Sequence, residues 1–413
     1  MLNSPNGSGP LEISQSKVNC NVNYIRSDTA EKLAVLAKKN RMQIHDLQVR
    51  RLKDVVLAPL GGYAGLYEDG KAIPHSHFSR AATFRESLPS NSLKGAGELH
   101  ETVFFLGKFH VCWGHCITDG LKFLWPFLNL EKYPFLKNCK IVYTTLSRDD
   151  VLPKNYLEIL RLLGIEKDRL VRLDWATVLH DCYLADESFG VDGVERWFTP
   201  EYRFTIERIV KACGVRDRTE KNGQKIYLSR SRWHGWTSGE FGERYVEKAF
   251  RDSGYDIVHP EQMHFGDFVQ KMYSAAEVAA TECSCSHNAL FMSAGARLVL
   301  LRKFDQINNH QLVINQFSDL DVVYVDIGKS ILFVNPKMHT AGPFFMYVTK
   351  YLARYLGVKA SFPIGEFAKY LNFACYQKGY RLLYDIAYGL YKLIVVRWLG
   401  ITKWNRGQIV QCV

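Results

Sequence analysis

Residues 278–301, VAATECSCSHNALFMSAGARLVLL, indicate the fold class of this chain. The stretch predicts a short buried strand at 278–281, a helix at 287–294 and a second strand at 297–301. Buried strands that alternate with helices are typical of parallel sheets in α/β proteins. The small residues between the first strand and the helix allow a ligand to approach the backbone closely.

The same alternation extends along most of the chain and predicts two successive α/β units. In the first unit we expect strands at 102–106, 140–144, 170–173 and 178–185, with helices at 117–130, 155–164 and 200–213. In the second we expect strands at 225–229, 255–258, 278–281, 297–301 and 322–326, with helices at 240–254, 265–274, 287–294 and 310–317. Two doubly wound domains would face a cleft, and ligands bind such folds beyond the carboxyl ends of the strands.

The composition divides the chain into four parts. A polar N-terminus at 1–16 is expected to be frayed, and a charged stretch near 214–224 separates a first domain at 17–220 from a second at 221–336. The remaining tail, 337–413, has eleven Lys or Arg and two acids, so it carries +9 of the net charge of +11.

The tail is basic, aromatic and predicted to be helical. One helical face would carry Tyr380, Tyr384, Tyr388, Tyr391, Val395 and Trp398. Such a helix can pack on the body of the protein, or it can lie on an anionic membrane surface. The charge and the aromatic content favour the membrane surface.

The composition also excludes several classes of protein. Hydrophobic residues are 47% and charged residues 23%, which is normal for a globular chain. Ten cysteines without a CxxC pair, and an N-terminus without a signal region, predict free thiols in the cytoplasm. No run reaches the roughly 18 apolar residues of a membrane span. No nucleic-acid-binding signature is present, so nucleic acid is not an expected partner.

His115 and Asp119 form the first candidate site. They lie four residues apart near the start of the first expected helix, where they share one helical face. A carboxylate can orient and charge an imidazole, and the pair can take a proton from a hydroxyl. The alternative is a pair that caps the helix. Cys112, His115 and Cys116 offer only three soft ligands, so we expect no metal there.

Polar residues also follow three strands of the second unit. Ser284, Ser286, His287 and Asn288 open an expected helix, whose free amides and dipole favour an anion such as a diphosphate. The alternative for this loop is an ordinary N-cap by Ser286.

The other two strand ends carry charged residues. Arg230 and Arg232 follow the strand at 225–229, and guanidinium groups bind phosphate bidentately. Glu261 follows the strand at 255–258, where a carboxylate can bind ribose hydroxyls. Solvated surface charges are the alternative for each of these residues.

Taken in order, these segments resemble glycosyltransferase family 61 over roughly residues 50–330. Five motifs carry the resemblance: Gly114, His115 and Asp119; a strand that ends in Arg230; the Gly-Tyr-x-Ile-Val-x-Pro-Glu run at 254–261; Gln270 before a short helix; and a small-residue loop that leads into Asn-Ala-Leu-Phe at 288–291.

The resemblance implies a GT-B fold, in which two Rossmann-like domains hold a nucleotide-sugar between them. It implies an inverting glycosyltransferase of capsular or other surface polysaccharide synthesis, peripheral at the inner face of the cytoplasmic membrane. The first domain would face a glycan or lipid-linked glycan acceptor, and the second would bind the donor, expected to be UDP-linked.

The resemblance also implies roles for the residues. Asp119 is expected to be the base with His115 as its partner, although the opposite assignment stays open. Arg230, Arg232 and the loop from Ser284 to Asn288, with Glu261, would bind the donor and stabilise the leaving diphosphate without a metal or other cofactor.

One departure from the family and two other functions remain. Many members have a glycine-rich loop where this chain has Glu282-Cys-Ser-Cys, and Glu282 beside a diphosphate would repel it. The chain could instead be a polysaccharide pyruvyltransferase that uses phosphoenolpyruvate. It could also be a non-catalytic scaffold that binds glycans or membranes.

Overall fold

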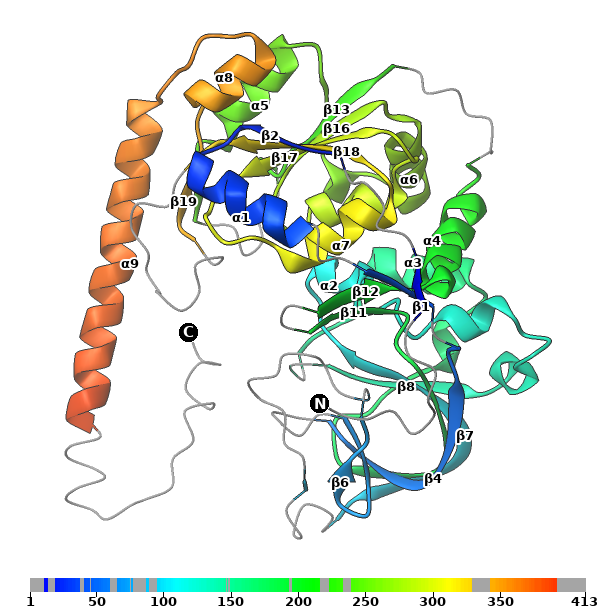
Figure 1. Cartoon of the computed structure of the whole chain (residues 1–413). Helices are drawn as coiled ribbons and strands as arrows, with labels where there is room; N and C mark the ends of the chain where they lie inside the picture. Colours follow the sequence, from blue (N-terminus) through cyan, green and yellow to red (C-terminus); the bar gives the residue numbers. More distant parts are fainter. Residues whose placement is uncertain are drawn as a thin grey trace.

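The protein is a mixed α/β structure built around two large sheets (Figure 1). The computed structural model describes residues 11–13, 19–37, 41–44, 46–59, 65–74, 76, 87–88, 95–145, 147, 149–192, 195–215, 223–232, 239–328 and 342–391. The α/β class expected from the sequence is confirmed.

The first large sheet has seven strands and mixed directions, in the order β6-β5-β4-β10-β7-β8-β9. β10, β7, β8 and β9 are parallel neighbours, whereas β4, β5 and β6 join antiparallel. The bounds are β4 Val49–Ala58, β5 Gly65–Glu68, β6 Lys71–Ala72, β7 Gly97–Phe109, β8 Lys140–Thr145, β9 Leu170–Arg172 and β10 Thr177–Ala185.

This sheet therefore differs from the doubly wound, Rossmann-like first domain that we expected. β4 pairs antiparallel with β10, and β5 and β6 continue the sheet beyond β4 through a hairpin turn at Asp69 and Gly70. Both turn residues have positive φ, 49° and 74°, which Asp tolerates and Gly adopts freely.

The second large sheet is entirely parallel, in the order β15-β13-β16-β17-β18-β2. The bounds are β2 Asn19–Tyr24, β13 Lys225–Leu228, β15 Asp256–Val258, β16 Glu277–Thr281, β17 Arg297–Arg302 and β18 Asp321–Asp326. The five strands expected here are confirmed. β2 was not predicted as a strand; it lies within the segment assigned to the first domain, at 17–220, and pairs with β18 of this sheet.

Two small sheets complete the strands of the described residues. One has the order β1-β3-β12-β11, with β1 Leu11–Ile13, β3 Arg41–Ile44, β12 Glu195–Phe198 and β11 Phe189–Asp192. Part of the N-terminus that was expected to be frayed is therefore a strand. The other pairs β14 Glu240–Phe241 with β19 Phe344–Phe345.

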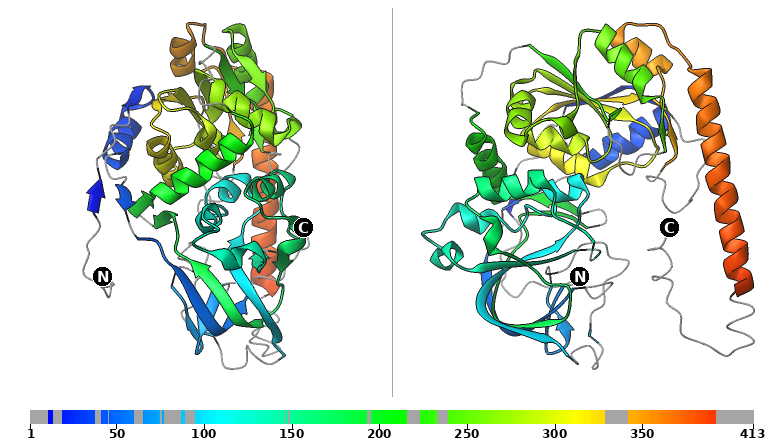
Figure 2. Two further views of the ribbon diagram at one scale, coloured as in Figure 1. Left: turned by 90° about the vertical axis from the view of Figure 1, so that its right-hand side faces the viewer. Right: turned by 180° about the vertical axis from the view of Figure 1, so that it is seen from behind.

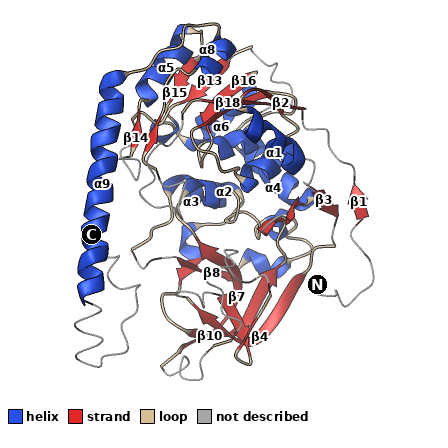
Figure 3. Ribbon diagram, turned by 60° about the vertical axis from the view of Figure 1, so that its left-hand side comes forward, coloured by secondary structure: helices blue, strands red, loops and turns tan. Residues whose placement is uncertain are grey.

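Most of the helices either flank the second sheet or lie between the two sheets (Figure 3). The bounds are α1 Ser27–Ala37, α2 Trp113–Ile117, α3 Lys154–Leu162, α4 Pro200–Ala212, α5 Glu243–Asp252, α6 Phe265–Ser274, α7 Asn309–Phe317, α8 Lys350–Leu356 and α9 Ile364–Tyr391. Short 3-10 helices are η2 Trp125–Leu128, η3 Pro134–Lys137, η4 Lys167–Arg169, η5 Pro260–Gln262 and η6 Ser286–Phe291.

Two of the expected helices are wrong. The helix at 117–130 is replaced by α2, turns and η2, since Pro126 lacks an N–H and its ring clashes within a helix interior. The helix at 287–294 is replaced by η6, which is six residues long. All six residues of η6 are buried. The apolar residues of this segment therefore reflect burial on every side, and not the single apolar face of an amphipathic helix.

One hydrophobic core runs through both large units. It joins Phe104 and Tyr156 of the first unit to Leu298 and Phe317 of the second, each 3% exposed or less. Two smaller clusters cover the outer faces of the second and first sheets. The units are therefore fused through the helices between them, not separated throughout by a cleft.

The tail forms α8 and the long helix α9, which extends from the second unit past the first (Figures 1 and 2). Tyr370 and Ala374 of α9 are buried, whereas Leu382, Leu383, Ile386 and Leu390 are 51–68% exposed. The predicted aromatic face, Tyr380 to Trp398, lies outside the side chains that the structure describes. Among the described helices, none combines the length and apolar character of a bilayer span.

Candidate active site

His115 and Asp119 form a short, shielded hydrogen bond between the two sheets. His115 lies in α2, directly after β7, and Asp119 lies in the turn that follows α2. His115 Nδ1 is 2.6 Å from Asp119 Oδ2, and the two side chains are 16% and 10% exposed. The contact predicted from their spacing is present.

Asp119 stays ionised in this setting. Burial alone would raise its pKa, but the hydrogen bond from His115 and the charges of Lys122 and His310 hold the pKa of Asp119 well below its usual range. Lys122 Nζ lies 3.9 Å from Asp119 Oδ1 and pairs with Glu187 at 2.5 Å. An ionised Asp119 is a weak base, but it can orient His115 and stabilise an imidazolium.

His310 of the second unit completes this group. It is the second residue of α7, its Nε2 lies 3.9 Å from Asp119 Oδ2, and its ring meets that of His115 edge-on at 5.6 Å. One ligand atom each of His115, Asp119 and His310 lies within 4.8 Å of the others, so a divalent cation could bridge them. The ammonium group of Lys122 opposes such a cation by charge repulsion.

The predicted loop of the second unit packs directly on α2. Cys112 Sγ lies 3.0 Å from Ser284 Oγ, and Trp113 Nε1 donates to Asn288 Oδ1 at 2.8 Å. A Cβ on Gly114 would lie 2.6 Å from His287 Nδ1, so only glycine permits this approach. The structure therefore brings together the two segments that the sequence placed on opposite sides of a cleft.

Two of the predicted loop residues, Ser286 and Asn288, have their side chains occupied inside the protein. Ser286 Oγ lies 2.6 Å from Gln311 Oε1 and accepts from the Cys283 amide at 3.2 Å. Asn288 Nδ2 donates to the Cys285 carbonyl at 2.8 Å. Their side chains hold the loop in shape and do not face a ligand.

His287 is also an internal residue. It is 7% exposed, and its Nε2 lies 3.1 Å from Asn308 Nδ2. Burial, together with His310 and His115, lowers its pKa to about 3, so its imidazole is neutral. Ser284 is partly exposed, whereas Ser286, His287 and Asn288 are buried. Because η6 is short, its dipole adds little attraction for an anion.

Glu282 does not act on the loop as we expected. Its side chain is 1% exposed and pairs at 3.1 Å with Arg302, which is equally buried. The Asn308 amide also donates to it at 3.3 Å. The carboxylate is thus neutralised inside the second unit, and the expected repulsion of a diphosphate does not follow.

Arg230 lies beside this loop in a cluster of charges. Its Nη1 is 2.9 Å from Glu240 Oε1 and 3.3 Å from Cys283 Sγ. Lys303, which follows β17 and is 2% exposed, pairs with the same oxygen of Glu240. The Arg230 amide donates to Glu243 Oε1 at 2.6 Å.

The protonation of Glu243 decides the net charge of this cluster. Burial and the charge of Glu240 raise the pKa of Glu243 to about 7. While Glu243 is protonated, the two cations face the single negative charge of Glu240. The cluster then has spare positive charge at the carboxyl edge of the parallel sheet, where ligands bind in α/β folds.

Arg232 and Glu261 lie further out on the same edge. Arg232 Nη1 donates to Gln262 Oε1 at 3.0 Å, and Glu261 Oε1 lies 3.8 Å from His259 Nδ1. Both residues are exposed. Arg232 follows β13, and Glu261 follows β15.

His310 and Lys303 were not among the residues predicted from the sequence. Lys303 follows a predicted strand, as Arg230 does, so the same argument from strand ends could have found it. His310 begins a predicted helix and matches no motif. Only the fold brings it to Asp119.

No family model matches this chain, and no curated protein matches it. The similarity to glycosyltransferase family 61 therefore stays a prediction from the sequence motifs.

Proposed function

We propose that the protein is an inverting glycosyltransferase in which the second, parallel unit plays the part of the donor-binding domain of a GT-B enzyme. It would move a sugar from a UDP-linked donor to a hydroxyl of a glycan or lipid-linked glycan in surface polysaccharide synthesis. One observation carries the proposal: the His115–Asp119 pair lies against the Ser284 loop, whose neighbour Cys283 contacts Arg230. A proton acceptor, from α2, and a cationic cluster thus both adjoin the same loop of the parallel sheet.

In this proposal His115 is the base and Asp119 is the residue that positions it. The low pKa of Asp119 makes it a poor proton acceptor. With Nδ1–H donated to Asp119, His115 Nε2 takes the proton of the acceptor hydroxyl. The hydroxyl oxygen forms a bond to the anomeric carbon as the bond to the diphosphate breaks on the opposite face, which inverts that carbon.

Arg230 and Lys303 would stabilise the departing diphosphate. Both cations are already desolvated and held by Glu240, so they need little rearrangement when negative charge develops. Arg232 and Glu261, on the outer part of the same edge, are proposed to contact the nucleoside. This assignment requires no metal.

The second half of α9 would hold the enzyme at an anionic membrane surface on the cytoplasmic side. Its exposed leucine and isoleucine side chains face solvent in this structure. The sequence of this segment also includes Lys378 and Arg381, and basic residues favour binding to anionic lipid. Apolar contact plus charge is the combination by which interfacial helices bind.

The test is calorimetric titration of the full-length protein with UDP in excess EDTA, and separately with phosphoenolpyruvate. We expect UDP to bind, and Arg230→Ala and Lys303→Met to weaken binding at least tenfold. Arg161→Ala is the matched control, because Arg161 is an exposed arginine that pairs with Glu158. Binding of phosphoenolpyruvate alone would support the pyruvyltransferase, and binding of neither compound would support the scaffold.

A second comparison separates the base from the donor site. His115→Ala should keep UDP binding and lower the transfer rate by about 100-fold to 10,000-fold. Transfer at the normal rate in this variant would contradict the assignment of His115.

A further inference from the structure

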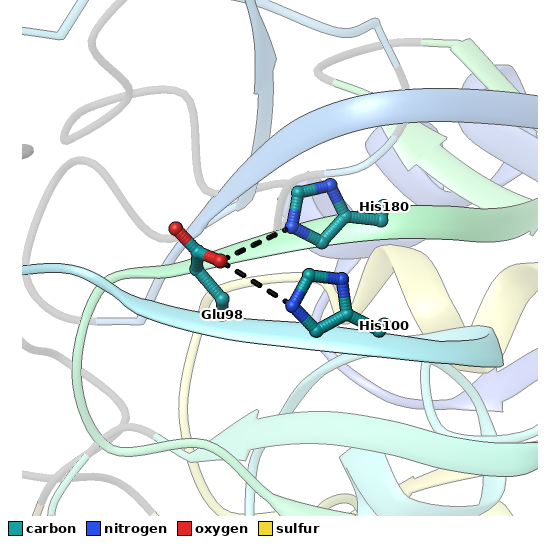
Figure 4. Close-up of side chains that lie close together, drawn as sticks. All are labelled: Glu98, His100 and His180. Atoms are coloured by element: carbon teal, nitrogen blue, oxygen red, sulfur yellow. Dashed lines mark ion pairs between the residues drawn. The ribbon is translucent and has the colours of Figure 1, made fainter.

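Three metal-ligand side chains meet on the first sheet, far from α2. Glu98 and His100 lie two residues apart near the start of β7, so both point to the same face of the strand. His180 comes from the neighbouring strand β10, and Figure 4 shows the three side chains converging. One ligand atom from each lies within 4.8 Å of the others.

The pairing of β10 with β7 is irregular at this arrangement. The register shifts between Leu179 and Asp181, where one residue of β10, His180, lies opposite two residues of β7, His100 and Glu101, so the extra residue is in β7. Leu179 and Cys182 belong to the same buried cluster, which a strict two-residue alternation would not allow. Bulges of this kind re-aim side chains and are frequent at functional sites.

The distances between the ligand atoms fit a tetrahedral ion. His100 Nε2 lies 3.3 Å and His180 Nε2 lies 3.6 Å from Glu98 Oε2. Zinc binds nitrogen and oxygen at about 2.0–2.1 Å, so neighbouring ligands in a tetrahedron lie about 3.3–3.4 Å apart. The two imidazole rings stack at 4.2 Å, and both Nε2 atoms face the same carboxylate oxygen (Figure 4).

A second carboxylate prepares His180 as a ligand. Asp54 Oδ1 lies 2.6 Å from His180 Nδ1, which places the proton on Nδ1 and a lone pair on Nε2. That Nε2 is shielded from solvent and has no hydrogen-bond partner among the described residues. Carboxylate partners of this type orient the histidine ligands of many zinc sites.

The charge balance also suits a divalent cation. Glu98 and Asp54 together supply two negative charges. Arg51 and Lys53, which lie beside Asp54 in β4, are engaged by Asp181 at 2.7 Å and 3.0 Å. Glu98 and His100 are 61% and 74% exposed, so an ion can reach the site from solvent.

We propose that Glu98, His100 and His180 bind a divalent transition metal of the zinc class, with water completing the coordination. The ion would tie β7 to β10 and, through Asp54, to β4. Phe109, at the end of β7 next to α2, lies nine positions after His100, a span of about 30 Å at about 3.3 Å per residue. The site is therefore a structural clip, independent of the proposed transfer reaction.

The test titrates ZnCl2 into the full-length protein by calorimetry with a reducing agent present, and measures the melting temperature with and without zinc. We expect His100→Ala and His180→Ala each to weaken zinc binding at least tenfold and to abolish the zinc-dependent rise in melting temperature. Asp54 has a positive φ of 54°, which asparagine also tolerates. Asp54→Asn removes the carboxylate that orients His180 and should weaken zinc binding about 10-fold to 100-fold. His264→Ala is the control, because His264 is an exposed histidine outside the cluster.

Two outcomes would overturn the proposal. One is zinc affinity that stays unchanged in both His100→Ala and His180→Ala. The other is zinc binding that is lost only in His310→Ala, which would assign the ion to the group around Asp119. Circular dichroism checks that each variant is folded. If an alanine variant is not folded, His100→Gln and His180→Gln, which keep more of the side-chain volume, replace it in the same titration.

Discussion

Glu243→Gln should remove a pH dependence from the stability of the protein. Glu243 is 6% exposed, and burial with the charge of Glu240 raises its pKa from 4.5 to about 7. Each unit between the folded and unfolded pKa corresponds to about 1.4 kcal/mol, so the full effect is about 3 kcal/mol. The amide of the Glu243→Gln variant would mimic the protonated carboxyl group, since it can still accept from the Arg230 amide and donate in place of the acid proton.

The sign follows from the raised pKa. Between pH 4.5 and 7 the folded protein keeps the Glu243 proton that the unfolded chain has released, so stability falls as pH rises through this window. We expect the free energy of unfolding of the wild type, relative to Glu243→Gln, to drop by about 2–3 kcal/mol between pH 5 and pH 8. The difference between the two proteins cancels the titration of groups that they share.

Urea denaturation at constant ionic strength measures this difference. Fluorescence and circular dichroism transitions should coincide before a single free energy is assigned. A difference that stays flat from pH 5 to pH 8, or that grows in the opposite direction, would refute the burial argument. A linked binding test is available, because UDP affinity should fall above pH 7 in the wild type as Glu243 ionises, but not in Glu243→Gln.

Three further changes test the packing and the tail. Gly114→Ala should destabilise the protein by about 1–3 kcal/mol in urea denaturation, because the new Cβ would lie 2.6 Å from the His287 Nδ1 atom. Gly266→Ala is the control and should leave the stability unchanged, because the space around Gly266 is open. Glu282→Gln should cost about 3–5 kcal/mol because it leaves a buried guanidinium unpaired, and Glu366→Gln, in an exposed pair, should change stability by less than about 1 kcal/mol. Leu383→Glu should reduce co-sedimentation with anionic vesicles about tenfold or more without changing UDP binding, and unchanged sedimentation would exclude this face of α9 from the membrane.

The sequence predicted the second sheet better than the first. The strands around Ala279 and Val299 are apolar on both faces and are separated by helices, which is a local signal for parallel pairing. In the first sheet, β4 pairs with β10 in antiparallel register, and the ion pair between Arg51 and Asp181 joins residues 130 positions apart in the sequence. Local patterns carry no information on such a distant pairing, nor on the pairing of β2 with β18.

The candidate site was predicted in part for the same reason. His115 and Asp119 are close in sequence, so helical spacing was enough to bring them together. His310, Lys303 and Glu240 reach the same region only through the tertiary fold. Ser286 and Asn288 were expected to bind a ligand because they follow a strand, but their burial at 1% and 2% directs them to internal partners.

The continuous core determines how a donor could reach this site. Opening the two units as separate domains would expose apolar residues such as Phe104 and Leu298, at about 25 cal/mol for each Å² of surface. The polar contacts between α2 and the Ser284 loop are cheaper to break, at about 0.5–1.5 kcal/mol for each hydrogen bond. A local shift of this loop therefore requires much less free energy than domain separation. His115 and His310, with 16% and 24% of their side chains exposed, mark the side from which a ligand would enter.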